Sequence, residues 1–268
     1  MTLETIKSLL RPLYHSAADG LADIRFWFRR KWRKLRRRGT SFPIKGTLCI
    51  LCVKRPAYAR LAVRNVNSLH FLNPGYRIRI VADDACTPAL RRMAARFDYR
   101  RMVEVVNRFG AENEPWQFQK VQCLMEASRS GWILMDADTI WHGEPETDPG
   151  KATMLVKAYD FGSKADERDF LSRNNMARAL PWPHFVTAFV SLPPALYSDE
   201  LARLAMEWTK KAFSDERLKR ISEEIGVNLA VQTLVPREKI TTLKQTDGPN
   251  DRYIMQSLYY GCVNDIKE

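Results

Sequence analysis

Long apolar runs are missing from this sequence. No stretch of 18 apolar residues occurs, so we predict no transmembrane helix. The amino-terminal end is a poor signal peptide, because it has no hydrophobic segment and because Glu4, Asp19 and Asp23 interrupt it. Internal repeats are absent as well. With 268 residues and 45% apolar content, the chain can build one large domain or two small ones.

Cysteine is scarce. Five cysteines, an odd number, are scattered along the chain, which argues against a disulfide framework. Cys49 and Cys52 form a C-x-x-C pair inside the apolar run 47–53. We interpret them as small buried side chains in a reducing cytosol, with a redox or zinc role as the alternative.

Charge is unevenly distributed along the chain. The net charge is +12, and residues 1–45 contribute +9 of it, from twelve basic and three acidic residues. Residues 25–38 interleave nine cations with four aromatics in a segment expected to be helical. Such a basic amphipathic helix suits an anionic membrane surface. We therefore expect a cytoplasmic protein, peripheral on the inner face of the membrane, with no nucleic-acid partner; a solvated tail and a nucleic-acid patch are the alternatives.

Strand and helix patterns alternate from residue 47 onward. The predicted strands are 47–53, 76–82, 102–106, 132–135, 154–158 and 185–192. The predicted helices are 56–72, 87–97, 116–130, 199–213 and 217–232, and residues 241–252 read as polar and rich in turns. This alternation predicts an α/β fold with a mostly parallel sheet covered by helices.

Two carboxylates, Asp136 and Asp138, follow the apolar run 132–135. In a strand, residues two apart point to the same face, so the two like charges would crowd together beside the core. That arrangement is costly unless a proton or a cation neutralises it. A divalent metal is the natural solution, and a metal with open positions binds phosphates.

Further polar groups follow the other predicted strands. Lys54 and Arg55 follow the first strand, and Asp83 and Asp84 follow the second. Ligands of open parallel sheets bind beyond the carboxyl ends of the strands. Such a set of groups suits a nucleoside diphosphate. The cations and a metal would bind the phosphates, and an acid would bind the ribose or the base.

Residues 46–240 resemble the GT-A nucleotide-sugar glycosyltransferases, most closely the glycogenin-like and bacterial lipopolysaccharide galactosyl- and glucosyltransferase group. The likeness rests on the opening strand, the acid after the next strand, Lys120 in the helical segment 118–121, and the D-x-D of Asp136 and Asp138. It implies a Rossmann-like GT-A domain over residues 46–268. Residues 46–143 would form the nucleotide-binding half and residues 144–268 the acceptor half, behind the leader of residues 1–45.

The resemblance also implies roles for single residues. Asp138 would bind Mn²⁺ or Mg²⁺, and Asp136 would share the metal or contact the ribose. Lys120 would contact phosphate or sugar, Asp83 the base or ribose, and Lys54 the phosphates. The implied reaction moves a hexosyl group from a nucleotide-diphosphate sugar, expected to be a UDP-sugar, to a glycan, such as a membrane-associated lipopolysaccharide or polysaccharide precursor.

Two features depart from the family pattern. Many relatives supply a third metal ligand from a histidine near the carboxyl terminus, whereas the last histidine of this chain is His184. Asp247, Asp251 or water could replace it. The predicted acceptor strand, 184–189, lacks the Asn-Ser/Thr-Gly of many relatives. An inverting enzyme would also need a carboxylate base, for which the sequence offers four acids without choosing among them: Glu223, Glu224, Asp247 and Asp251.

Two other classes of protein remain as alternatives. A HAD-like phosphatase carries D-x-D-x-T after an apolar strand, but the fifth position of this motif is Ile140, and several strand–helix units precede it. The second alternative is a non-enzymatic protein that binds membranes or nucleic acid and whose acids are structural.

Overall fold

The computed structural model describes residues 44–72, 75–96, 100–110, 114–141, 147–176, 182–244 and 255–257. The proposed leader helix, His142, Asp247 and Asp251 lie outside these residues. Within them, no helix has the length and apolar character needed to cross a membrane.

The first half alternates strands with helices. Its strands are β1 (Gly46–Cys52), β2 (Tyr76–Ala82), β3 (Val103–Asn107) and β4 (Ile133–Asp136). The elements between them are α2 (Pro56–Leu72), α3 (Thr87–Ala94), the 3-10 turn η1 (Arg100–Met102) and α4 (Trp116–Arg129). Pro88, the second residue of α3, supports the start of that helix, because the missing N–H of a proline has no partner in the first turn in any case.

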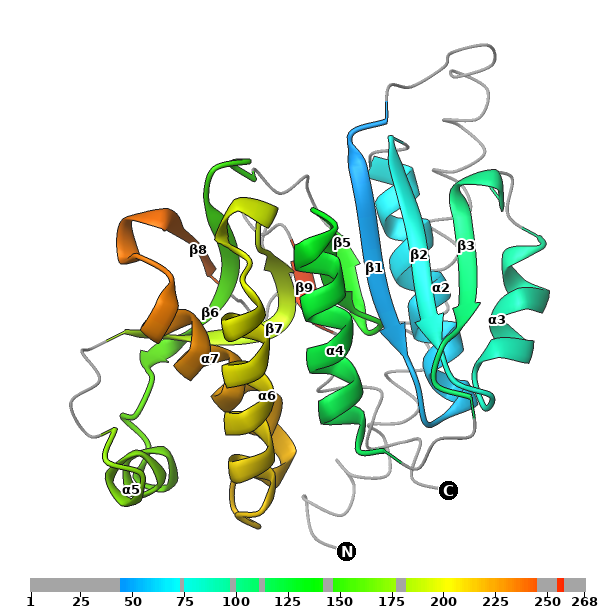
Figure 1. Ribbon diagram of the computed structural model, residues 1–268. Helices are drawn as coiled ribbons and strands as arrows, with labels where there is room; N and C mark the ends of the chain where they lie inside the picture. Colours follow the sequence, from blue (N-terminus) through cyan, green and yellow to red (C-terminus); the bar gives the residue numbers. More distant parts are fainter. Residues whose placement is uncertain are drawn as a thin grey trace, which may run out of the picture.

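The second half extends the same sheet. Its strands are β6 (Ala152–Asp160), β7 (Pro183–Ser191) and β8 (Ile240–Lys244), and a separate ribbon pairs β5 (Thr139–Trp141) with β9 (Met255–Ser257). The helices are α5 (Ala165–Arg173), α6 (Asp199–Phe213) and α7 (Ser222–Leu234), with the short turns η2 (Pro194–Leu196), η3 (Lys219–Ile221) and η4 (Arg237–Lys239). α5 stands away from the sheet in Figure 1.

Seven strands form the main sheet in the order β3-β2-β1-β4-β7-β6-β8. β1, β2, β3 and β4 are mutually parallel, and β6 is parallel to β8. β7 runs antiparallel to both of its neighbours, β4 and β6. The α/β class with a mostly parallel sheet, predicted from the sequence, is thereby confirmed.

Helices cover both faces of the sheet (Figure 1). α2 and α3 pack on one face against the side chains of Leu48, Ile50 and Ile80. α4, α6 and α7 cover the other face, against Cys49, Leu51 and other residues of the same strands. β1 is therefore buried on both sides, which explains its nearly continuous apolar sequence. Cys49 and Cys52 are buried free thiols, as expected for small core residues.

α6 and α7 cross at close range. A Cβ added to Gly226 of α7 would lie 2.4 Å from the carbonyl oxygen of Ala205 and 2.0 Å from Oγ1 of Thr209, both on α6. Only glycine allows this approach. The contact fixes where the first turn of α7 stands relative to the sheet.

Several elements differ from the sequence prediction. The polar stretch beginning at residue 241 is strand β8 as far as Lys244, because pairing with β6 overrides its weak local pattern. α5 was not predicted, since its composition is mostly polar and few of its residues are buried. β4 ends at Asp136, and Asp138 lies in the following turn. The two carboxylates therefore do not share a strand face, although they remain close in the chain.

Candidate active site

The carboxyl ends of β1 and β4 mark the point where the strand order reverses. β1 continues through β2 and β3 on one side, and β4 lies on its other side. Asp136 is the last residue of β4 and pairs in register with Leu51 of β1. Crevices at such reversal points are where open α/β sheets bind their ligands. The D-x-D pair therefore stands at the position that the topology favours for a site.

Lys120 of α4 is the cation at this point. Its side chain is buried, and its Nζ lies 2.7 Å from Oδ1 of Asp136. The same nitrogen lies 3.7 Å from Oε1 of Glu223, at the first turn of α7. Burial alone would lower the pKa of Lys120, but the charges of Asp136 and Glu223 raise it above its ordinary value. Lys120 is thus a buried ammonium group shared by two carboxylates from different elements.

Asp138 is 6% exposed. Burial, and then the neighbouring charge of Asp136, raise the pKa of Asp138 to about 7, against a smaller opposing effect of Lys120. A further cation close to Asp138 would favour the ionised form of its carboxyl group. The electrostatic argument made from the sequence therefore holds, although the turn rather than a strand brings the two carboxylates together.

Glu223 is the carboxylate that the sequence could not single out. It is 3% exposed, and burial raises its pKa to about 7. Thr187 of β7 donates a long hydrogen bond of 3.4 Å to its Oε1. Its Oε2 has no partner among the described residues. A buried carboxylate oxygen without a partner costs free energy unless a ligand satisfies it, so Glu223 belongs to the site.

Glu224, next in sequence, is engaged elsewhere. Its Oε2 accepts from Nζ of Lys157 at 2.5 Å and lies 3.0 Å from Nε2 of His184. On the other side of the ring, Nδ1 of His184 lies 3.1 Å from Oε1 of Glu167, close enough for an ion pair but not aligned as a hydrogen bond. These four side chains form a buried, charge-balanced cluster that ties β6 and β7 to α5 and α7.

The pKa values within this cluster move in the directions that pairing requires. Burial opposes charge on Glu224, but His184 and Lys157 lower its pKa to about 2. Burial also opposes charge on His184, yet Glu167 and Glu224 raise its pKa, outweighing the repulsion from Lys157. His184, the first residue of the predicted acceptor strand 184–189, is fully buried, with Glu167 and Glu224 beside its two ring nitrogens.

Asp83 and Lys54 meet at the neighbouring strand ends. The backbone N–H of Lys54 donates to Oδ2 of Asp83, and the N–H of Cys86 donates to Oδ1 at 2.9 Å. Lys54 has a left-handed φ of 77° and an exposed side chain. Burial of part of its side chain, and then the charge of Arg55, lower its pKa. Asp83 therefore joins two loops through backbone donors, and its contact with base or ribose stays a prediction.

The fit of a metal ion rests on the two D-x-D carboxylates and on nearby oxygens. Asp138 and Asp136 are hard oxygen donors of the kind that Mg²⁺ and Mn²⁺ take. The buried Oγ1 of Thr139, next to Asp138, has no partner among the described residues. Across the described part of the chain, no three His, Cys, Asp or Glu side chains form a group that could hold a metal ion. Asp136 and Asp138 suit a cation that takes its other ligands from water and from a bound phosphate.

Similar solved structures are glycosyltransferases. Galactosyltransferase LgtC, in complex with donor and acceptor sugar analogs, aligns with a TM-score of 0.46 and 9% identity over 73% of this chain and 72% of its own. Glycosyltransferase GlyE of Streptococcus pneumoniae TIGR4 aligns with a TM-score of 0.46 and 13% identity, over 75% of this chain and 45% of its own. Mannosyltransferase PcManGT from Pyrobaculum calidifontis, in complex with GDP-Man and Mn²⁺, aligns with a TM-score of 0.33 and 15% identity. The alignment covers 84% of this chain and 81% of its own.

No protein-family model and no curated protein matches this sequence. The structural neighbours belong to the enzyme class that the sequence resemblance names. With TM-scores below 0.5 and low identities, these similarities say nothing about the chemistry of this chain. The function is therefore argued from Lys120 and the carboxylates around it.

The cluster around His184 generates a stability prediction. Replacing Glu224 with Gln leaves His184 and Lys157 as neighbouring buried cations, and we expect a loss of about 3–5 kcal/mol at pH 7. The pKa of Glu224 falls from 4.5 to about 2 on folding, so its contribution is present above pH 4.5 and lost as the pH falls toward 2. The difference between wild type and variant should shrink over that interval.

Urea unfolding at pH 7, 4.5 and 2.5 measures this difference. Glu216→Gln is the control, because Glu216 forms an exposed pair with Lys219 and its loss should change stability by about 0.5 kcal/mol or less. A Glu224→Gln difference that is small at pH 7, or that does not change with pH, contradicts the paired cluster.

Proposed function

We propose that this protein is a metal-dependent glycosyltransferase that moves a hexosyl group from a nucleotide-diphosphate sugar, expected to be a UDP-sugar, to a glycan acceptor. One observation carries the proposal: Lys120 is buried between Asp136 and Glu223 at the strand reversal, with the buried Asp138 close by. This arrangement combines a cation, a metal-competent carboxylate pair and a further carboxylate of raised pKa. A donor diphosphate calls for the first two elements, and an inverting sugar transfer calls for the third.

Asp136, Asp138 and Lys120 have separate roles at the donor diphosphate in this proposal. Asp138 and Asp136 would hold Mn²⁺ or Mg²⁺, which supplies Lewis-acid stabilisation of the departing diphosphate. The ammonium group of Lys120 adds positive charge at the same point, where negative charge grows in the transition state. Both groups are fixed before substrate arrives, since Lys120 is held by two ion pairs and Asp136 ends a central strand. Little reorganisation is then needed during the reaction.

Glu223 is our candidate for the acceptor side. Transfer breaks the bond between sugar C1 and the diphosphate oxygen and forms a bond from C1 to an acceptor oxygen, whose proton must leave. A carboxylate with a pKa near 7 can accept that proton at neutral pH. Glu224 is unsuited to this role, because its pKa is about 2 and its Oε2 is held by Lys157 and His184.

The proposed acceptor is a glycan carried at a membrane, such as a lipopolysaccharide or polysaccharide precursor. Support comes from residues 25–38, whose nine cations and four aromatics suit anionic lipid at the inner face of a cytoplasmic membrane. These residues lie outside the described part of the structure, so this part of the proposal rests on the sequence alone.

Asp138 gives the direct test of the metal and donor site. In Asp138→Asn, binding of UDP or GDP that depends on Mn²⁺ should fall at least tenfold, measured by calorimetry with and without the metal. Glu238→Gln is the control, because Glu238 is exposed and lies in the turn η4. Unchanged Mn²⁺-dependent binding in Asp138→Asn would exclude the proposed donor site. Hydrolysis of simple phosphoesters by the wild type would instead favour a phosphatase.

Glu223→Gln separates chemistry from donor binding. Once a donor screen over UDP-, GDP- and CMP-sugars has found the active sugar nucleotide, this variant should lose transfer by about 10²-fold or more. Nucleotide affinity should stay within about threefold, because Lys120 keeps its closer partner, Asp136. Full transfer activity in a folded Glu223→Gln protein would remove Glu223 from the reaction.

The leader prediction concerns lipid binding by the full chain. Replacing the nine cations of residues 25–38 with Gln should lower co-sedimentation with anionic liposomes by at least about 100-fold, because each cation near the surface contributes about 1 kcal/mol. Liposomes of neutral phosphatidylcholine serve as the control. Equal sedimentation of wild type and variant would contradict the membrane role of these residues.

A further inference from the structure

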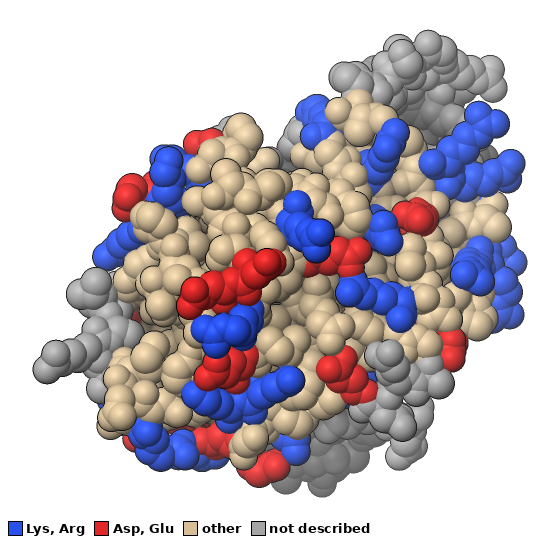
Figure 2. All heavy atoms as spheres, in the orientation of Figure 1, with Lys and Arg blue, Asp and Glu red and all other residues tan. Residues whose placement is uncertain are grey.

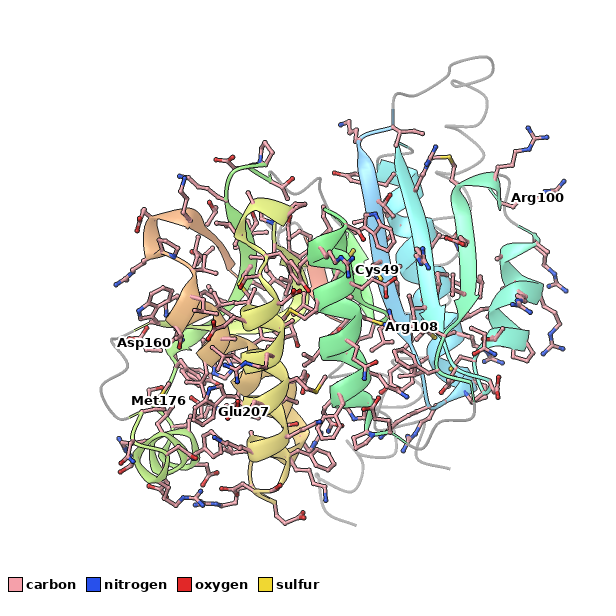
Figure 3. The ribbon with its side chains drawn as sticks, viewed as in Figure 1. Cys49, Arg100, Arg108, Asp160, Met176 and Glu207 are labelled. Atoms are coloured by element: carbon pink, nitrogen blue, oxygen red, sulfur yellow. The ribbon has the colours of Figure 1, made fainter. Side chains whose placement is uncertain are left out.

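Five arginines are exposed along one edge of the sheet, and we call them the arginine edge: Arg91, Arg92, Arg96, Arg100 and Arg101. The first two lie in the last turn of α3, and the last two lie in η1. Figure 3 shows Arg100 extending outward from this margin, and Figure 2 shows basic side chains gathered along it. No ion pair links any of the five to a carboxylate among the described residues.

Several exposed cations of the second half have acidic partners. Arg203 pairs with Glu200 and Glu207, and Lys211 also pairs with Glu207. Arg217 pairs with three aspartates, and Lys219 pairs with Glu216. The arginine edge differs from these positions in gathering five exposed arginines within residues 87–101, none of them paired with a described acid.

Folding alone does not account for the arginine edge. The helix dipole favours Arg91 and Arg92 in the last turn of α3, but it does not extend to Arg96, Arg100 or Arg101. Residues 87–101 contain five arginines and one acid, Asp98, which lies outside the described residues. Like charges at this density repel one another, so a partner that carries negative charge would stabilise the surface.

The arginine edge extends to the end of the sheet at which β1 begins. η1 directly precedes β3, and Val103 of β3 pairs with Ile78 near the start of β2. The N–H of Lys45 donates to the carbonyl of Gly75 at 2.8 Å, so residue 45 meets the start of the same strand. Ile44, beside it, is 52% exposed. The described chain therefore begins, at residues 44 and 45, at the same end of the sheet as η1.

We propose that the arginine edge is a second docking surface for an anionic phospholipid bilayer, within the folded body and additional to the leader. Guanidinium groups bind phosphate oxygens in a bidentate manner, which suits lipid headgroups. We choose a membrane over nucleic acid because residues 25–38 of the same chain, with four aromatics among nine cations, already suit anionic lipid. The surface does not depend on the transfer reaction.

This surface and the candidate active site lie toward opposite ends of the sheet. β1 has seven residues, so its two ends are about 23 Å apart at about 3.3 Å per residue. Asp136 stands at the carboxyl end, and η1 stands at the amino end. Changing the arginines should therefore leave nucleotide binding intact, which separates failure of this proposal from failure of the proposed function.

The test uses the full chain with its leader unchanged. Arg91, Arg92, Arg100 and Arg101 are replaced together by Gln, and partition into vesicles of phosphatidylserine and phosphatidylcholine is measured at low salt. The matched control replaces Arg168, Lys210, Lys211 and Lys239 by Gln, which removes the same charge from exposed positions outside the edge. Circular dichroism and Mn²⁺-dependent nucleotide binding report whether each variant is folded.

We expect the edge variant to bind phosphatidylserine vesicles at least tenfold more weakly than wild type, and the control variant to change less than threefold. Equal weakening in the two variants would show a general effect of net charge and overturn the proposal. Unchanged vesicle binding in the edge variant overturns it too. Loss of duplex DNA binding, with vesicle binding retained, would assign the surface to nucleic acid instead.

Discussion

The ammonium group of Lys120 is the charge on which the candidate site depends. It lies between Asp136, at the end of a central strand, and Glu223, at the start of α7. Without it, the site would hold three acidic side chains close together with no opposing charge in a buried place. The same cation sets the state of its neighbours, since it opposes the rise in pKa of Asp138 and Glu223 that burial causes. Structure and proposed chemistry therefore rest on one side chain.

A second charged cluster ties together elements of the second half of the chain. His184, Lys157, Glu167 and Glu224 balance one another beside the site without entering it. Because Glu224 adjoins Glu223, this cluster also fixes the first turn of α7, and the close crossing at Gly226 fixes the helix that follows. Adjacent glutamates in the sequence thus take different tasks, one structural and one facing the site.

Charge organises the exterior as well as the interior. Several exposed cations of the second half, such as Arg203 and Arg217, pair with nearby acids, whereas the five arginines of the edge do not. The η1 part of the edge and residue 45 lie at the same end of the sheet, away from the strand ends that carry the D-x-D pair. A body bound through that end would leave its proposed site open to a glycan extending from the membrane.

The sequence by itself determined the α/β class and the strands of the first half, and it singled out Asp136 and Asp138 as candidates, because apolar periodicity and an unexplained pair of like charges are local signals. It missed α5 and β8, whose patterns are weak and whose formation depends on packing and strand pairing. It also could not choose Glu223 over Glu224. Only the tertiary structure decided that, since burial beside Lys120 or pairing with His184 depends on contacts between residues far apart in the chain.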